Sequence, residues 1–479
     1  MQQIMKGGAN MDEQRNHESQ SVNPRRKKRS QLQIFKEVYL PAVIAFLALL
    51  LVLIFIIGSI VRAVQRNKYE AQVSSAAAES VAQELARLEQ EANNLLAKAS
   101  MAAQSCNYDE AIAILDSYSG GVSNHAELDA MRTKYVNAKE TMVLWNDPAQ
   151  VLNLSFQLLI ADPERAFTNE TYGTSFNRNF ITTEEFSKIL QQLYENGYIL
   201  IRMSDITDGT QVKDLYLPNG KKPLILTQTN VNYNTYIIDG DNDKLPDKDG
   251  AGFASKLIID PNGNLSCEMV DSSGQTVTGA FDLVPILDAF IETHPDFSYR
   301  GAKAILAVTG YDGLFGYRTT PAADDYFGTA FHTEQVESAK QIAAALRESG
   351  YEIACYTYEN VEYGLYSTEQ VLADLKRWAD EVTPILGNVD TFVFARNSDI
   401  AESGTVYSGD KYELLKAQGF TYYIGFCTEG TPWFTATADY VRQGRILVSG
   451  SNMAHHAEWF DGLFDPFSIL DNRRGTAPD

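Results

Sequence analysis

Short apolar segments alternate with segments of helical periodicity from residue 147 almost to the C-terminus, and this alternation constrains the fold more than any other feature. Chains that alternate strand and helix in this way favour a parallel sheet covered by helices. The sequence therefore predicts an α/β fold for residues 144–479, entered at Asp147-Pro148. The predicted strands are 151–160, 198–203, 224–227, 351–356, 391–394 and 422–426, and the predicted helices are 182–197, 334–348, 368–382 and 411–418.

Residues 38–61 form an uncharged apolar run, long enough as a helix to cross a hydrocarbon core of about 30 Å at about 1.5 Å per residue. A dense basic cluster, residues 25–29, precedes the run. Since positive charge collects on the cytoplasmic side, we expect one membrane span with residues 1–37 as a disordered cytoplasmic tail. The C-terminal domain is then extracytoplasmic, and the protein is predicted to reside in the cell membrane.

Residues 62–143 have the periodicity of helices and are interpreted as a stalk. Residues 107–115 resemble one helix of a single tetratricopeptide-type hairpin. Two interpretations stay open: a stalk that packs on itself, on a second copy or on an envelope protein, and a peptide-binding repeat. The heptad-like positions are Val81, Leu85, Leu88, Ala92, Leu95 and Ala99.

The composition excludes nucleic acid as a partner. Lys and Arg number 40 against 62 Asp and Glu, which gives a formal net charge of -22. A surface this acidic repels a phosphate backbone. No CxxC spacing occurs, and the pairing of the cysteines outside the cell, in one or two disulfides or none, is left open. The cysteines are Cys106, Cys267, Cys355 and Cys427.

One stretch, residues 222–233, joins a strand-like apolar run to a polar segment. In a parallel barrel this junction lies at the C-terminal rim, where active sites sit. Here the chain resembles the polysaccharide deacetylase family, carbohydrate esterase family 4, and in particular a membrane-anchored branch found in Gram-positive bacteria. The resemblance covers residues 147–453. It is carried by residues 158–163, 180–186, 294–303, 309–313 and 316–319, which include His294-Pro295-Asp296-Phe297 and Thr309-Gly310-Tyr311-Asp312-Gly313.

The resemblance implies a distorted (β/α) barrel with fewer than eight strands. It also implies a divalent metal such as Zn²⁺, held by an aspartate and a His-x-x-x-His pair, and a second aspartate as the base. In this sequence the base position is Thr229, and the ligand positions are Asn230, Tyr356 and Asn360. Because these side chains are neither carboxylates nor imidazoles, we expect no resident cofactor and a catalytically inactive domain that binds cell-wall glycan or acts as an envelope scaffold.

The alternative is an active polysaccharide N-deacetylase with a remodelled metal site. Its substitute ligands would come from Cys355, Glu359, Cys427, His455 and His456, which are residue types that bind zinc. For the catalytically inactive, glycan-binding domain, aromatic, amide and guanidinium groups near the rim suit sugar rings and hydroxyls. These candidate glycan-binding residues are Gln228, Asn232, Tyr233, Arg318, Tyr358 and Arg396.

An acidic loop follows the rim segment. Its aspartates recur at about every second position, as in loops whose oxygen ligands converge on Ca²⁺. The loop lacks a glutamate at the twelfth position and has Lys244 in place of the central glycine. A calcium site and a solvated acidic loop both fit this pattern. The aspartates are Asp239, Asp241, Asp243, Asp247 and Asp249.

Overall fold

The computed structural model describes residues 49–62, 75–240 and 243–475. The chain divides into two compact units, residues 1–86 and 87–479. In the first unit residues 49–62 are helical, whereas residues 1–48, which include the basic tail and the start of the predicted span, lie outside the described part. Within that part no helix combines the length and the apolar character needed to cross a membrane. The membrane span stays a prediction.

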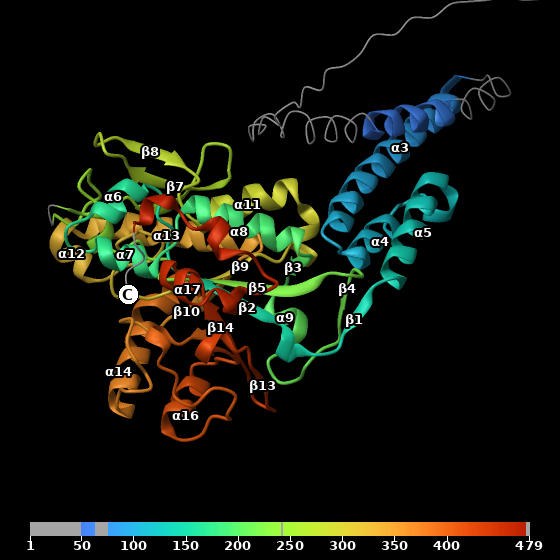
Figure 1. Cartoon of the computed structure of the whole chain (residues 1–479). Coiled ribbons are helices and arrows are strands. Elements are labelled where there is room, and N and C mark those ends of the chain that lie inside the picture. Colours follow the sequence, from blue (N-terminus) through green and yellow to red (C-terminus); the bar gives the residue numbers. More distant parts are fainter. Residues whose placement is uncertain (1–48, 63–74, 241–242, 476–479) are drawn as a thin grey trace, which may run out of the picture. The chain divides into compact units, whose positions relative to one another are not determined.

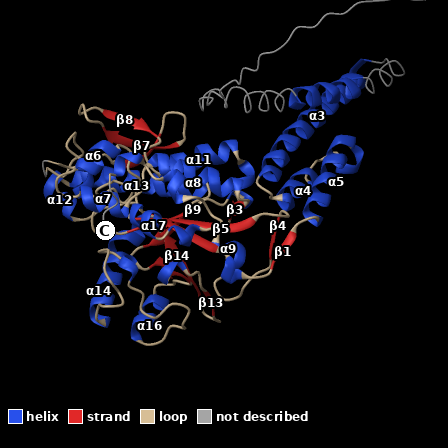
Figure 2. Ribbon diagram, viewed as in Figure 1, coloured by secondary structure: helices blue, strands red, loops and turns tan. Residues whose placement is uncertain are grey.

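The second unit is built around a closed barrel of seven parallel strands. The hydrogen-bonded order is β12-β11-β10-β9-β5-β2-β14, and β14 also pairs with β12, which closes the ring. Figure 2 shows these strands at the centre with helices around them. The predicted (β/α) barrel with fewer than eight strands is therefore confirmed as an architecture. The strands are β2 (Leu152–Phe156), β5 (Lys222–Thr229), β9 (Ala304–Val308), β10 (Glu352–Cys355), β11 (Thr391–Val393), β12 (Tyr422–Phe426) and β14 (Val441–Leu447).

Alternation along the strands gives the barrel two hydrophobic clusters. In β5, Leu224 and Leu226 belong to a cluster shared with the surrounding helices, whereas Ile225 belongs to a separate cluster. Successive side chains of a strand point to opposite faces, so the second cluster fills the barrel interior. Inside it, the Thr227 hydroxyl donates to Asn153 Oδ1 at 2.9 Å.

Helices cover the outside of the barrel, in the alternating order that the sequence predicts (Figure 1). The first predicted helix is confirmed with its capping box, since the Thr182 hydroxyl accepts from Glu185 N and the Glu185 carboxylate accepts from Thr182 N. The α-helices are α6 (Pro163–Thr168), α7 (Gly173–Asn179), α8 (Thr183–Glu195), α9 (Met203–Ile206), α10 (Thr235–Ile238), α11 (Leu283–Thr293), α12 (Ala322–Phe327), α13 (Thr329–Glu348), α14 (Thr368–Arg377), α15 (Thr383–Leu386), α16 (Asp410–Ala417), α17 (Gly450–His455) and α18 (Pro466–Ile469).

Strands outside the ring complete the sheet structure. β3 (Tyr198–Leu200) adds to β5, and β13 (Phe434–Ala436) pairs antiparallel with β14. An antiparallel sheet that the sequence did not predict, β6 (Lys256–Ile259), β7 (Leu265–Val270) and β8 (Thr276–Gly279), follows the acidic loop. A two-stranded sheet joins β1 (Val143–Trp145) to β4 (Leu215–Leu217).

The helical segment before the barrel packs on itself. α4 (Tyr108–Asp116) and α5 (Ala126–Glu140) form a hairpin, and the part of α3 (Ser75–Gln104) that belongs to the second unit packs on it. Ala92 and Ala99 of the heptad-like seam are buried against this hairpin. The hairpin contacts the barrel through the ion pair of Asp109 with Arg300, and the turn before α4 bonds to it as well, since Arg300 N donates to Ser105 O at 2.7 Å. The likeness to a tetratricopeptide hairpin stays a prediction.

Candidate functional site

The C-terminal rim of the barrel carries an unusual concentration of left-handed backbone. After β5, Asn230 has φ 60°; after β10, Thr357 and Asn360 have φ 61° and 55°; after β11, Arg396 has φ 51°. Asparagine tolerates this region, but threonine and arginine adopt it at a cost of about 1–3 kcal/mol, and such residues cluster at functional sites. The strained turns therefore single out this end of the barrel.

The position of the family base holds no proton acceptor of suitable strength. Thr229 is buried, and its hydroxyl donates to Phe156 O at 3.3 Å. A carboxylate does lie close to the preceding residue: Gln228 Nε2 donates to Asp282 Oδ1 at 2.7 Å. Asp282 is fully enclosed, and burial raises its pKa. It is thus a core group that holds the strand, out of reach of a ligand in solution.

The three positions of the family ligands hold amides and a phenol. Asn230 Nδ2 donates to Gln157 Oε1 at 3.1 Å, and the Oδ1 atoms of Asn230 and Asn360 are buried without a hydrogen-bond partner. Tyr356 is buried inside the barrel mouth beside Arg445, whose guanidinium carbon lies 6.0 Å from the centre of the ring. Burial lowers the pKa of Arg445, and Tyr356 opposes that change.

Arg445 is a residue of the barrel mouth that sequence reasoning missed. Its guanidinium donates from Nη2 to Phe394 O at 2.8 Å, and from Nη1 to Ile424 O and Gly425 O at 3.1 and 2.9 Å. The group therefore joins the ends of β11 and β12 from its place on β14. Two arginines in a seven-residue strand concealed that strand in the sequence.

Most of the predicted glycan-binding residues hold loops in place. The Asn232 amide donates to Thr309 O and Gly313 O and accepts from Thr309 N, so it joins the segment after β5 to the segment after β9. The Tyr233 hydroxyl donates to Asp282 Oδ2 at 2.6 Å. Since Gln228, Asn232 and Tyr233 are fully buried, their side chains do not face solvent at the rim.

The other three candidates differ in exposure. Arg318 is buried and donates to the carbonyls of Asp312 and Tyr233. Tyr358 is buried under Arg377, whose guanidinium carbon lies 4.0 Å from the centre of the ring. Arg396 is exposed, and its Nε donates to Asn360 O at 2.8 Å. Arg396 is therefore the member of the set that is available to a ligand.

Three exposed tyrosines lie in loops at the same rim as Arg396, and none of them was among the predicted site residues. Tyr172, Tyr236 and Tyr311 are 39, 45 and 38% exposed and lie in segments that follow β2, β5 and β9. The rings of Tyr172 and Tyr236 meet edge to face with centroids 5.5 Å apart. Burial, Asp312 and Tyr236 raise the pKa of Tyr311 to about 12, and the charge of Arg396 opposes this rise.

The signal for these tyrosines was present in the sequence. Tyr311 stands in the Thr309-Gly310-Tyr311-Asp312-Gly313 segment that carried the family resemblance, and Tyr236 lies three residues after Tyr233. An aromatic residue in a polar loop after a parallel strand is a candidate for ligand contact, because such loops converge on one rim. We call Tyr172, Tyr236, Tyr311 and Arg396 the rim platform.

The substitute ligands of the remodelled metal site do not form a metal-binding group within the described residues. Cys355 and Cys427 are buried thiols, and burial raises the pKa of Cys427 to about 12. Glu359 pairs with Arg377, and the His456 ring stacks on Trp459 with centroids 4.3 Å apart. In the described ranges no three His, Cys, Asp or Glu side chains are grouped so as to hold a metal ion. All four cysteines are free.

The acidic loop is held by its own carboxylates. Asp239 accepts from Lys244 N at 2.6 Å, and Asp243 accepts from Leu245 N at 2.8 Å. Asp247 accepts from Gly240 N and from Asp249 N, at 3.0 and 2.7 Å. Asp241 lies outside the described residues. These bonds fit a solvated acidic loop, and the calcium site stays a prediction.

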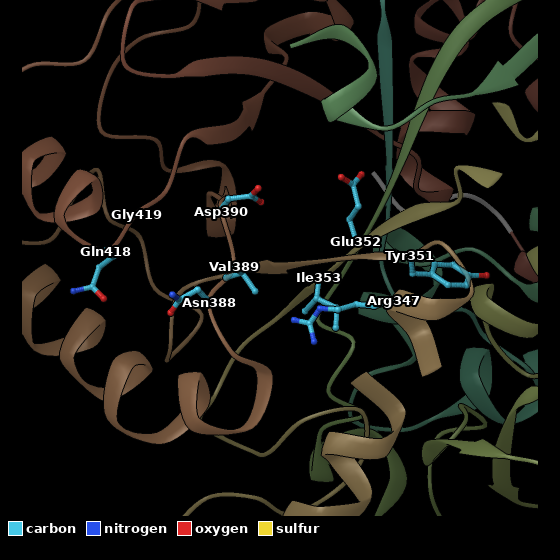
Figure 3. A pocket seen from close by; sticks show the side chains of 9 residues that line it. All are labelled: Arg347, Tyr351, Glu352, Ile353, Asn388, Val389, Asp390, Gln418 and Gly419. Atoms are coloured by element: carbon cyan, nitrogen blue, oxygen red, sulfur yellow. The ribbon is translucent and has the colours of Figure 1, made fainter. Parts of the chain in front are cut away.

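A polar pocket of about 410 Å³ opens at the other end of the barrel (Figure 3). It lies where β10 and β11 begin, and Glu352, Asp390 and Arg347 are among its lining residues. Burial raises the pKa of Glu352 to about 7, Arg202 opposes this rise, and Asp390 and Asp205 add to it. In parallel barrels this end contributes to stability, whereas the chemistry belongs to the opposite rim.

Comparisons with known proteins leave the family open. No family model matches the chain, and no curated protein matches it. Among solved structures, one match is a Streptococcus pyogenes deacetylase, PplD, in complex with acetate, at 13% identity and a TM-score of 0.33. The match covers 66% of this chain and 98% of that one. Similarity at this level assigns neither a family nor an activity to the chain.

Proposed function

We propose that the barrel domain binds a polysaccharide of the cell envelope on its rim platform and does not deacetylate it. The observation that carries the proposal is the set of exposed side chains, Tyr172, Tyr236, Tyr311 and Arg396, in loops at the end of the barrel where parallel strands present ligand-binding loops. Tyrosine faces stack on sugar rings, and a guanidinium donates to sugar hydroxyls. Binding of this kind requires neither a metal nor a base.

The chemistry of the family positions supports the second half of the proposal. Deacetylation needs a group that takes a proton from water, and the Thr229 hydroxyl does not do so near neutral pH. Asn230, Tyr356 and Asn360 offer neither charge nor imidazole to a divalent cation. The proposal also includes anchoring of the chain by one span over residues 38–61, which places the platform on the outside of the membrane.

Binding of an N-acetylglucosamine hexamer to the purified full chain, measured by calorimetry, tests the platform. We expect Tyr236→Ala and Tyr311→Ala each to weaken binding about 3- to 10-fold, the equivalent of about 0.5–1.5 kcal/mol for one aromatic contact. Tyr216→Ala is the matched control, because Tyr216 is equally exposed, at 46%, but lies on β4. Binding that neither Tyr236→Ala nor Tyr311→Ala weakens would rule out the platform.

The same sample separates binding from catalysis. Metal content and acetate release from the hexamer are measured alongside the calorimetry. Stoichiometric zinc together with acetate release would overturn the inactive interpretation and support the remodelled deacetylase. Retained glycan binding without acetate release agrees with the proposal.

A further inference from the structure

A second cleft lies between the helical hairpin and the barrel. Its volume is about 710 Å³, within the range of ligand-binding pockets. One wall comes from α4 and α5, and the other from α9, β4 and the turn at Tyr299–Gly301. Both walls belong to the same compact unit. The cleft is separate from the rim platform, since none of its lining residues belongs to that platform.

An ion pair and a backbone hydrogen bond join the two walls. Asp109 of α4 pairs with Arg300 of the barrel at 3.0 Å and also with Lys139 of α5. Arg300 N further donates to Ser105 O at 2.7 Å. A cleft with tied walls is preorganised, and a ligand that enters it loses less free energy to ordering the protein.

Part of the lining is aliphatic. Ile112, Val136 and Met142 line the hairpin side, and Leu215 lines the opposite side. Aliphatic surface of this kind gains free energy by burying apolar groups and offers no hydrogen bonds to hydroxyls. Tyr216 lies at the same cleft, 46% exposed, and supplies one more face for packing.

The charges around the cleft are unbalanced. Six lining residues are charged, and four of them are acidic. Both cations, Lys139 and Arg300, already pair with Asp109. Glu140 and Asp214 are exposed and form no ion pair within the described part of the chain. A ligand that combined apolar side chains with positive charge would match both features of the cleft.

We propose that this cleft binds a short peptide segment of a partner protein, rich in apolar residues and carrying lysine or arginine. Apolar side chains of the segment lie against Ile112, Val136 and Met142, and its cations face Glu140 and Asp214. The hairpin and the barrel thus form one receptor surface for a protein, in addition to the glycan surface at the rim. The complementary charge accelerates association and selects against acidic peptides.

Selection of random dodecapeptides displayed on phage against the immobilised full chain tests the proposal. We expect the enriched peptides to contain apolar residues with an excess of Lys and Arg, and synthetic copies to bind with an affinity that falls as salt increases. Tyr216→Ala should weaken these peptides about 3- to 10-fold, which corresponds to one lost aromatic contact. The double change Glu140→Lys and Asp214→Lys should weaken them at least as much.

Two controls keep the result specific. Glu402→Lys reverses one exposed charge on the loop between β11 and α16 and should leave peptide binding unchanged. Tyr236→Ala removes a residue of the rim platform and should also leave it unchanged. Absence of enrichment, enrichment of acidic or uncharged peptides, or equal binding to the double variant would overturn the proposal. Binding of the N-acetylglucosamine hexamer that is lost with Tyr216→Ala would instead assign the cleft to a saccharide.

Discussion

Replacement of Glu352 by glutamine should stabilise the protein at alkaline pH and not at acidic pH. Glu352 begins β10 at the end of the barrel opposite the C-terminal rim, where burial is the main cause of its raised pKa, and Asp390 and Asp205 add to it. The pKa is about 7, against an ordinary value of 4.5. A group with a raised folded-state pKa contributes stability below pH 4.5, and this contribution is lost as the pH rises through 7.

The size of the effect follows from the two pKa values. At about 1.36 kcal/mol per pKa unit, the ionised carboxylate lowers the free energy of unfolding by about 3 kcal/mol above pH 7. The side chain retains partial contact with water, which screens the charge and reduces the expected value to about 1–2 kcal/mol. A glutamine keeps the shape and the hydrogen-bonding oxygen without the charge, so the variant should gain this amount at pH 8.

Urea denaturation followed by tryptophan fluorescence measures the difference between the variant and the wild type. We expect a higher midpoint for Glu352→Gln at pH 8 and nearly equal midpoints at pH 4.5. Asp390→Asn removes a neighbouring negative charge and should lower the pKa of Glu352, so the loss of stability should begin at a lower pH than in the wild type. A difference of the same size at both pH values would refute the reasoning, since it would show an effect of packing rather than of ionisation.

Three further predictions concern the core, the acidic loop and the orientation of the chain. Asp282→Ala leaves the buried donors of Leu159, Gln228 and Tyr233 without an acceptor and should lower the free energy of unfolding by about 3 kcal/mol or more, measured by denaturation, whereas a loss below about 1 kcal/mol would contradict this role. If the acidic loop binds Ca²⁺, calcium should raise the melting temperature, and the double change Asp241→Ala and Asp243→Ala should abolish the rise. A wild-type melting temperature that does not change with calcium would support the solvated loop instead. Protease added to cells without an outer barrier should remove the C-terminal domain, and protection of that domain would reverse the predicted orientation.

Local patterns in the sequence were sufficient to predict the elements with clear periodicity. The helix after Thr182 begins with the capping box read from four residues, and β12 (Tyr422–Phe426) has the predicted bounds. β14 was missed because Arg442 and Arg445 resemble surface residues. In the fold, the partner of Arg442 is Asp399 at 2.8 Å, and Arg445 donates to carbonyls of β11 and β12. Partners this distant in the sequence are not visible in a local pattern.

At the rim, too, contacts between residues distant in the sequence decide which side chains can reach a ligand. Gln228 and Tyr233 were assigned to a ligand because polar side chains after a buried strand are usually exposed. Both instead bond to Asp282, about fifty residues away, which makes them part of the core. The exposed tyrosines lie on three separate segments, which come to one rim only when β2, β5 and β9 pair side by side.

The closure of the barrel by β14 also determines the order in which the domain becomes complete. β14 pairs with β2, the first strand of the ring, and with β12, and Gln443 donates to Val151 O across 292 residues of chain. During synthesis from the N-terminus, one edge of β2 stays unpaired until β14 has been made. Exposed edges of this kind can pair with other chains, so a translation product that ends before Val441 should be an open sheet prone to aggregation.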